Sequence, residues 1–89
     1  MIGEFFLNKE NIFESVQNIF REVFDEEDLI IANETNSEDI EEWDSLNHIN
    51  LVISIEKQFG IRFMTGELQL LKDVGEMIDL LDTKINRIT

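Results

Sequence analysis

The sequence of 89 residues contains no cysteine and no proline. Without cysteine, neither a disulfide framework nor a thiolate metal site can form, so any thiol chemistry must be supplied by another molecule. No apolar run approaches the roughly 20 residues of a transmembrane helix, and the N-terminus lacks the basic and apolar regions of a signal peptide. We therefore expect a cytoplasmic protein with one domain and one core.

Basic residues are also scarce, because 20 Asp and Glu face 7 Lys and Arg, for a formal net charge of −13. Such a surface repels nucleic acid backbones and anionic membranes and favours partners with basic patches. No Lys or Arg occurs from Glu22 to Glu56, and ten acids lie between Asp25 and Asp44. Taken alone, this acidic segment is better explained as a solvated loop that maintains solubility than as a binding surface, because runs of like charge are usually solvated.

Apolar residues at three- and four-residue steps predict a first helix from about Lys9 to Phe24, with Asn8 as its N-cap. Its expected core face consists of Ile12, Phe13, Val16, Ile19, Phe20, Val23 and Phe24. The four acids at 25–28 oppose the helix dipole and should end the helix. A long connection follows, from Leu29 to Asp44. The side chains expected to anchor it in the core are Leu29, Ile30, Ile31 and Ile40.

A second helix is predicted from Ser45 to Phe59, followed by Gly60 as a left-handed C′ residue. Its expected buried positions are Leu46, Ile49, Val52, Ile55 and Phe59. Leu51 and Ile53 widen the apolar stripe, so at least one of them should be partly exposed. The alternation at 61–63 predicts a short extended crossing.

A short third helix is predicted across Gly66 to Leu71, capped by Thr65, and a last helix begins at Asp73. Glu76 completes an Asp-x-x-Glu pattern similar to a capping box. The core stripe of this last helix consists of Val74, Met77, Ile78, Leu81 and Ile85. The sequence thus predicts an all-α fold, a small bundle of three main helices plus a short third helix. We assign it to residues 9–89, after an N-terminal extension of residues 1–8.

The three residues Asp44-Ser45-Leu46 stand where the acidic loop enters the second helix. Asp and Ser are preferred N-caps and Leu46 begins the apolar stripe, so these residues alone are explained by helix initiation. A serine in the first turn nevertheless faces solvent at the positive end of the helix dipole, where backbone N–H groups stabilise a phosphodiester. The sequence places no base to activate Ser45 as a catalytic triad requires. His48 is interpreted as a surface residue, with a contact to a partner or to a group attached at Ser45 as the alternative.

The longer stretch Glu42-Trp43-Asp44-Ser45-Leu46-Asn47-His48-Ile49 resembles the acyl carrier protein family, which includes peptidyl carrier relatives. The resemblance continues through Leu51, Val52, Ile55, Glu56, Phe59, Gly60, Ile61, Phe63, Leu68, Leu71, Val74 and Leu81. It implies a right-handed four-helix bundle in which a phosphopantetheinyl transferase attaches 4′-phosphopantetheine from coenzyme A to Ser45. Acyl cargo would be carried as a thioester on the terminal thiol of this arm. The chain would then be a carrier and not an enzyme.

The resemblance also implies that the second helix is the recognition surface for acyl-activating or acyl-transferring enzymes with basic docking patches. The residues to which it assigns partner contacts are Asp44, Leu46, Ile53 and Glu56. Leu46 is further expected to anchor the first turn so that Ser45 points outward. Asn47 and Asn50 stand where many family members have acids, which favours a dedicated partner enzyme. We expect a monomer of the free-standing type.

Other interpretations stay open from the sequence. An EF-hand calcium loop needs a glycine at its sixth position, and none lies between Asp25 and Asp44. An acidic adaptor without an arm, or a mimic of nucleic acid charge, is compatible with the net charge. An enzyme with Ser45 as nucleophile would lack a base. Fatty acyl, polyketide, aminoacyl and small hydroxyacyl cargo all remain possible, and an aminoacyl or peptidyl carrier is the main alternative. Trp43 before the motif is nonetheless closer to acyl carriers than the Gly-Gly common in peptidyl carriers.

Overall fold

The computed structural model describes residues 8–64, 67 and 72–86. All regular secondary structure in this part of the chain is helical, with α1 at Lys9–Val23, α2 at Ser45–Phe59 and α3 at Val74–Ile85. Each helix begins within one residue of its predicted start, which confirms the all-α prediction with three main helices. The short helix expected across 66–71, apart from Glu67, and residues 1–7 of the expected extension lie outside the described residues.

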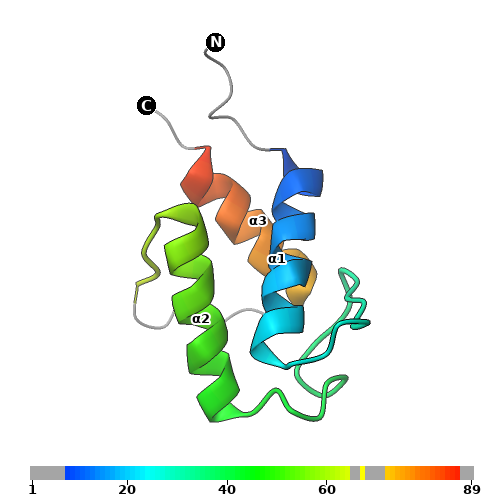
Figure 1. Ribbon diagram of the computed structural model, residues 1–89. Helices are drawn as coiled ribbons and strands as arrows, with labels where there is room; N and C mark the ends of the chain where they lie inside the picture. The colour runs from blue at the N-terminus through cyan, green and yellow to red at the C-terminus, as the bar shows by residue number, and fades with distance from the viewer. Residues whose placement is uncertain (1–7, 65–66, 68–71, 87–89) are drawn as a thin grey trace.

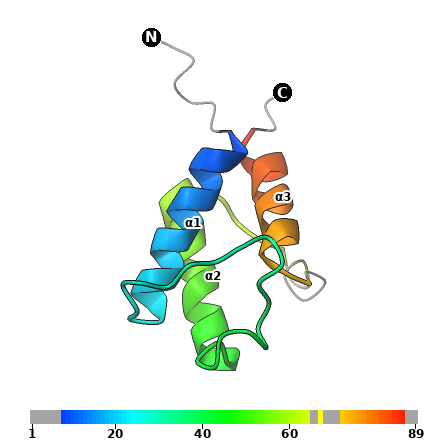
Figure 2. The same cartoon turned by 90° about the vertical axis from the view of Figure 1, so that its right-hand side faces the viewer.

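Helix α1 packs against both α2 and α3. It runs antiparallel to the other two, so that α1 begins and α3 ends at one end of the bundle (Figures 1 and 2). Helix α2 begins at the opposite end, directly after the long connection that crosses the molecule from α1. This arrangement presents the first turn of α2 at the end of the bundle.

The core confirms the predicted faces of α1 and α3. All seven apolar residues expected on the α1 face are buried or packed against the core, and so are the five expected on α3. Burial of each large apolar side chain contributes about 1.5–3 kcal/mol, so these two faces account for much of the stability. Asn8 caps α1 as predicted, since its Oδ1 accepts a hydrogen bond from Asn11 N at 2.8 Å.

The predicted core face of α2 is wrong in part. Leu51 and Ile55 are fully buried, whereas Leu46 is 68% exposed and Ile49 is 54% exposed. Ile53 is exposed as expected. Apolar residues occur on two sides of this helix, and the side that carries Leu51 and Ile55 packs into the core shared with α1 and α3. The other side leaves a stripe of exposed apolar side chains.

The long connection is held to α1 by both backbone and side chains. Arg21 Nε donates a hydrogen bond to Leu29 O at 2.7 Å, and Gln17 Oε1 accepts one from Ile31 N at 3.0 Å. Ile31 and Ile40 are buried and Leu29 packs against the core, as predicted. Ile30 is 77% exposed, which contradicts its predicted place in the core. Its neighbour Ile31 faces inward, and successive residues of extended chain face opposite sides.

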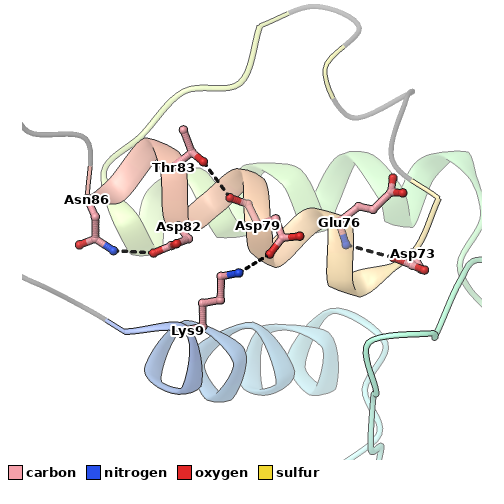
Figure 3. Close-up of polar contacts among 7 residues, drawn as sticks. All are labelled: Lys9, Asp73, Glu76, Asp79, Asp82, Thr83 and Asn86. Carbon is pink, nitrogen blue, oxygen red and sulfur yellow. Dashed lines mark hydrogen bonds and ion pairs between the residues drawn. The ribbon is translucent and has the colours of Figure 1, made fainter.

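The start of α3 shows a variant of the predicted capping pattern (Figure 3). Asp73 Oδ1 accepts a hydrogen bond from Glu76 N at 3.0 Å, while Glu76 Oε1 accepts one from Lys72 N, one residue before the cap. Farther along the helix, Lys9 Nζ lies 2.6 Å from Asp79 Oδ1 and joins α1 to α3. Both side chains are largely exposed, so this ion pair adds little to stability.

The chain leaves α2 through Gly60, whose φ of 66° is left-handed as predicted. Phe63 then packs against the core, and its N–H donates a hydrogen bond to Glu56 Oε2 at 2.9 Å. The stretch 61–64 has no regular secondary structure. Among the described residues, no helix is long and apolar enough to span a bilayer.

Candidate functional site

Ser45 is the first residue of α2, and its side chain is exposed. Asp44 caps the helix, since its Oδ1 accepts a hydrogen bond from Asn47 N at 2.9 Å and its carbonyl accepts one from His48 N at 2.8 Å. Within the described chain, no hydrogen bond involves the Ser45 hydroxyl or the backbone N–H groups of Ser45 and Leu46. The first turn of α2 therefore keeps a solvent-facing hydroxyl beside two available N–H donors.

Asn47 explains one departure from the family pattern. Its Nδ2 donates a hydrogen bond to Glu42 O at 2.9 Å and so fastens the end of the acidic loop to α2. A carboxylate at this position could not donate that bond. Asn50 Nδ2 makes a longer contact of 3.4 Å with Asn47 Oδ1.

Trp43 and His48 form a pair that the sequence did not reveal. Trp43 Nε1 donates a hydrogen bond to His48 Nδ1 at 3.0 Å, and the two rings are inclined by only 18°. Trp43 also meets Phe20 edge-on, at 5.2 Å between ring centroids, and Phe24 at 6.2 Å. The imidazole is thereby joined to the aromatic core at the end of α1. His48, interpreted from the sequence as a surface residue, has a partly buried side chain.

The Trp43 contact determines which nitrogen of His48 carries the proton. Burial lowers the pKa of His48 below its ordinary value of 6.5, so the ring is neutral near pH 7. Because Nδ1 accepts from Trp43, Nε2 carries the proton of the neutral imidazole. His48 is therefore a hydrogen-bond donor toward its surroundings and is not poised to take the Ser45 hydroxyl proton. This tautomer argues against a serine nucleophile activated within the chain.

A pocket of about 550 Å³ lies beside Ser45, between the start of α2, the start of α3 and the long connection. Its volume is within the range of small-molecule sites. Its lining residues are Ser37, Trp43, Asp44, Ser45, His48, Ile49, Lys72, Asp73 and Met77. Trp43, Ile49 and Met77 give it an apolar part next to the polar groups, of which Lys72 is the basic one.

The predicted partner contacts lie on or next to one side of α2. Leu46 and Ile53 are exposed, together with Ile49, which the sequence assigned to the core. The expectation that Leu46 anchors the first turn in the core is wrong, because this side chain faces solvent. Glu56 is partly buried and bonds to Phe63 N, so it also has a structural role at the end of the helix.

The acidic loop shows no arrangement typical of a cation site. In the described ranges, no group of three or more His, Cys, Asp or Glu side chains is positioned to hold a metal ion. Asn36 Oδ1 accepts a hydrogen bond from Glu38 N and Asp39 Oδ2 accepts one from Asn36 N, so these polar side chains stabilise turns.

Comparisons with known proteins agree on one family. Residues 14–81 match the family model described as a phosphopantetheine attachment site. The chain is 28% identical over 79 residues to an acyl carrier protein of Coprothermobacter proteolyticus, covering 89% of this chain and 96% of that protein. It is 31% identical over 75 residues to an acyl carrier protein of Acidothermus cellulolyticus, covering 84% and 89%. It also resembles the solution NMR structure of a holo acyl carrier protein from Geobacter metallireducens, with a TM-score of 0.79, 45% identity and coverage of 84% and 86%.

Proposed function

Because the chain belongs to the acyl carrier protein family, and is thus a carrier of phosphopantetheine-linked intermediates rather than an enzyme, we propose that Ser45 is the residue that bears the arm. The main support for this proposal is the position of Ser45. It is an exposed serine hydroxyl at the N-terminus of α2, next to available N–H groups and at the edge of a 550 Å³ pocket.

The local chemistry suits a phosphodiester at this position. The positive end of the α2 dipole and the N–H groups of Ser45 and Leu46 stabilise an anion on the Ser45 oxygen. The bound arm supplies a terminal thiol, on which acyl groups are held as thioesters. This thiol provides the chemistry that a chain without cysteine lacks.

A phosphopantetheinyl transferase modifies Ser45 and must supply the catalytic groups. Ser45 Oγ forms a bond to the β-phosphorus of coenzyme A while the bond from that phosphorus to the 3′,5′-bisphosphorylated adenosine breaks, and the hydroxyl proton passes to a base. His48 is already protonated at Nε2 and bonded to Trp43 at Nδ1. The base therefore belongs to the transferase.

Partner enzymes dock on α2 through its exposed apolar side chains and nearby acids. Leu46 and Ile53 supply the apolar contacts, while Asp44 and Glu56 face basic patches of the partner. The net charge of −13 accelerates encounter with such patches. We further propose that residues 9–89 form the carrier domain after an extension of residues 1–8, and that the protein is a cytoplasmic monomer.

The test is intact-mass analysis after incubation with coenzyme A and a promiscuous phosphopantetheinyl transferase. The wild-type chain should gain one phosphopantetheine group, and Ser45→Ala should gain none. Ser54→Ala is a matched control, because Ser54 lies later on the same helix, and it should be modified like wild type. Modification that persists in Ser45→Ala would place the arm elsewhere. A wild-type chain that stays unmodified with several transferases would favour an adaptor without an arm.

A further inference from the structure

Attachment of an arm to Ser45 does not by itself require the Trp43–His48 pair. The chain contains one tryptophan and one histidine, and the two are hydrogen-bonded to each other beside Ser45. Trp43 already buries its ring against Phe20 and Phe24. A neutral apolar partner would suffice to stack on its remaining face. The polar contact instead fixes the orientation and the tautomer of the imidazole.

The position of His48 on α2 brings its ring toward Ser45. Residues three apart on a helix lie on the same face with about 5–6 Å between their Cβ atoms. Helical side chains also lean toward the N-terminus, which is the turn that Ser45 occupies. Both residues line the same pocket. A group bonded to Ser45 Oγ is therefore within reach of the His48 ring.

We propose that His48 Nε2–H donates a hydrogen bond to a phosphodiester oxygen of the arm on Ser45, and that Trp43 is the positioning residue that keeps Nε2 protonated. This inference rests on the proposed attachment at Ser45. The bond joins a neutral N–H to an anionic oxygen and is stronger than a bond between neutral groups. It directs the first segment of the arm along the pocket.

The other charged side chains that line the pocket are two carboxylates, of Asp44 and Asp73, and one ammonium group, of Lys72. The Asp44 carboxylate accepts a hydrogen bond from Asn47 N, and the Asp73 carboxylate accepts one from Glu76 N. Both carry negative charge and cannot donate to a phosphodiester. Lys72 also lines the pocket, from the residue before the Asp73 cap of α3, and it is the competing cation that the second experiment tests.

The first experiment compares the ring nitrogens of His48 in the apo and holo proteins by NMR, where the single histidine gives one set of signals. The Nε2–H tautomer should persist in both forms. The pKa of His48 should be higher in the holo protein, because the phosphodiester anion stabilises the imidazolium. Ser45→Ala treated with the same reagents should titrate like the apo protein. An identical titration of apo and holo wild type would overturn the proposal.

The second experiment uses two substitutions with opposite chemistry. His48→Phe keeps a ring to stack on Trp43 but removes the donor, and it should shift the phosphorus NMR signal of the arm. His48→Gln returns an N–H near the position of Nε2 and should restore much of the wild-type signal. A signal that responds to Lys72→Gln but not to His48→Phe would assign the contact to Lys72 and contradict the proposal.

Intact mass distinguishes a failure to attach the arm at Ser45 from a loss of the contact between the arm and His48. Each variant is weighed before spectroscopy, so a failure to load tests the attachment at Ser45 and not the contact to His48. Trp43→Phe should load normally but lose the exclusive Nε2–H tautomer. If Trp43→Phe keeps that tautomer unchanged, Trp43 does not position the ring. Slower loading of His48→Phe with an unchanged phosphorus signal would make His48 a transferase contact and would also contradict the proposal.

Discussion

Helices α2 and α3 have the same type of N-cap, but the backbone N–H groups in their first turns differ in their hydrogen bonding. Each follows an aspartate N-cap, Asp44 or Asp73, and both caps line the same pocket. At the start of α3, Val74 N donates to Thr35 O at 2.9 Å and Gly75 N donates to Asn33 O at 2.8 Å. The long connection thus occupies these N–H groups. At the start of α2, the corresponding N–H groups of the first two residues have no partner among the described residues.

This difference shows that a helix dipole alone does not make an anion site. The second residue of α3 is Gly75, where an added Cβ would lie 3.1 Å from Asn33 O. The second residue of α2 is Leu46, which is 68% exposed. The first turn of α3 is sealed, in the sense that the long connection binds its N–H groups. The first turn of α2 is open, because its N–H donors and the Leu46 side chain are accessible to other molecules. The open turn carries the serine.

The largest expected effect is on the free energy of unfolding, and it should differ between two leucines of α2. Leu51→Ala should lower the free energy of unfolding by roughly 2–5 kcal/mol, because Leu51 is fully buried against the core. Leu46→Ala should change it by less than about 0.5 kcal/mol, because Leu46 faces solvent. Urea unfolding followed by circular dichroism measures both. Equal losses would mean that the open turn is packed after all.

Leu46→Ala also has an expected functional effect that Leu51→Ala, once corrected for unfolding, should not share. A side chain that dominates a docking surface costs more than about 1 kcal/mol when truncated, and we expect Leu46→Ala to lower kcat/KM of the transferase roughly tenfold. Steady-state transfer measured at saturating coenzyme A checks it. Wild-type kcat/KM in Leu46→Ala would remove this side chain from the proposed docking surface.

The sequence predicted the helices well, but not which side of α2 faces the core. Apolar residues follow helical spacing at 46, 49 and 53 and again at 51 and 55, so periodicity alone gives two candidate faces. The choice depends on where α1 lies, which is tertiary information. The pair of Trp43 and His48 was missed for a related reason. Their spacing of five residues corresponds to no helical contact, since Trp43 precedes the helix.

The next effect concerns the first turn of α3, whose N–H groups bond to the long connection. Gly75→Leu should lower the free energy of unfolding by roughly 1–3 kcal/mol, because the new side chain meets Asn33 and displaces the connection from α3. The substitution gives α3 the residue that α2 carries at the same helical position. Hydrogen exchange at Val74 and Gly75 should become faster, and loading of Ser45 should remain close to wild type. Unchanged exchange at these two amides would show that the connection does not seal the turn.

The smallest expected effect is a pH dependence that belongs to the open turn. Burial lowers the pKa of His48, so the unfolded chain binds a proton near pH 6.5 while the folded protein does not. The apo protein should therefore lose stability as the pH falls through this region, and the loss should be absent in His48→Gln. Glu67, whose pKa is lowered from 4.5 by the Met64 N–H and Lys84, loses its contribution only at more acidic pH.

The contribution of His48 to stability can be separated from that of Glu67 by urea unfolding between about pH 7.5 and 5.5, where histidine titrates and most carboxylates do not. The difference in stability between wild type and His48→Gln should shrink toward acidic pH, since protons bind preferentially to the unfolded wild-type chain. The difference between wild type and Gly75→Leu should stay constant, because neither Gly75 nor its contact Asn33 titrates. If the His48→Gln difference is equally constant, the imidazole is solvated in the folded protein. His48 would then not distinguish the first turn of α2 from that of α3, and the two turns would differ only in the hydrogen bonding of their backbone N–H groups.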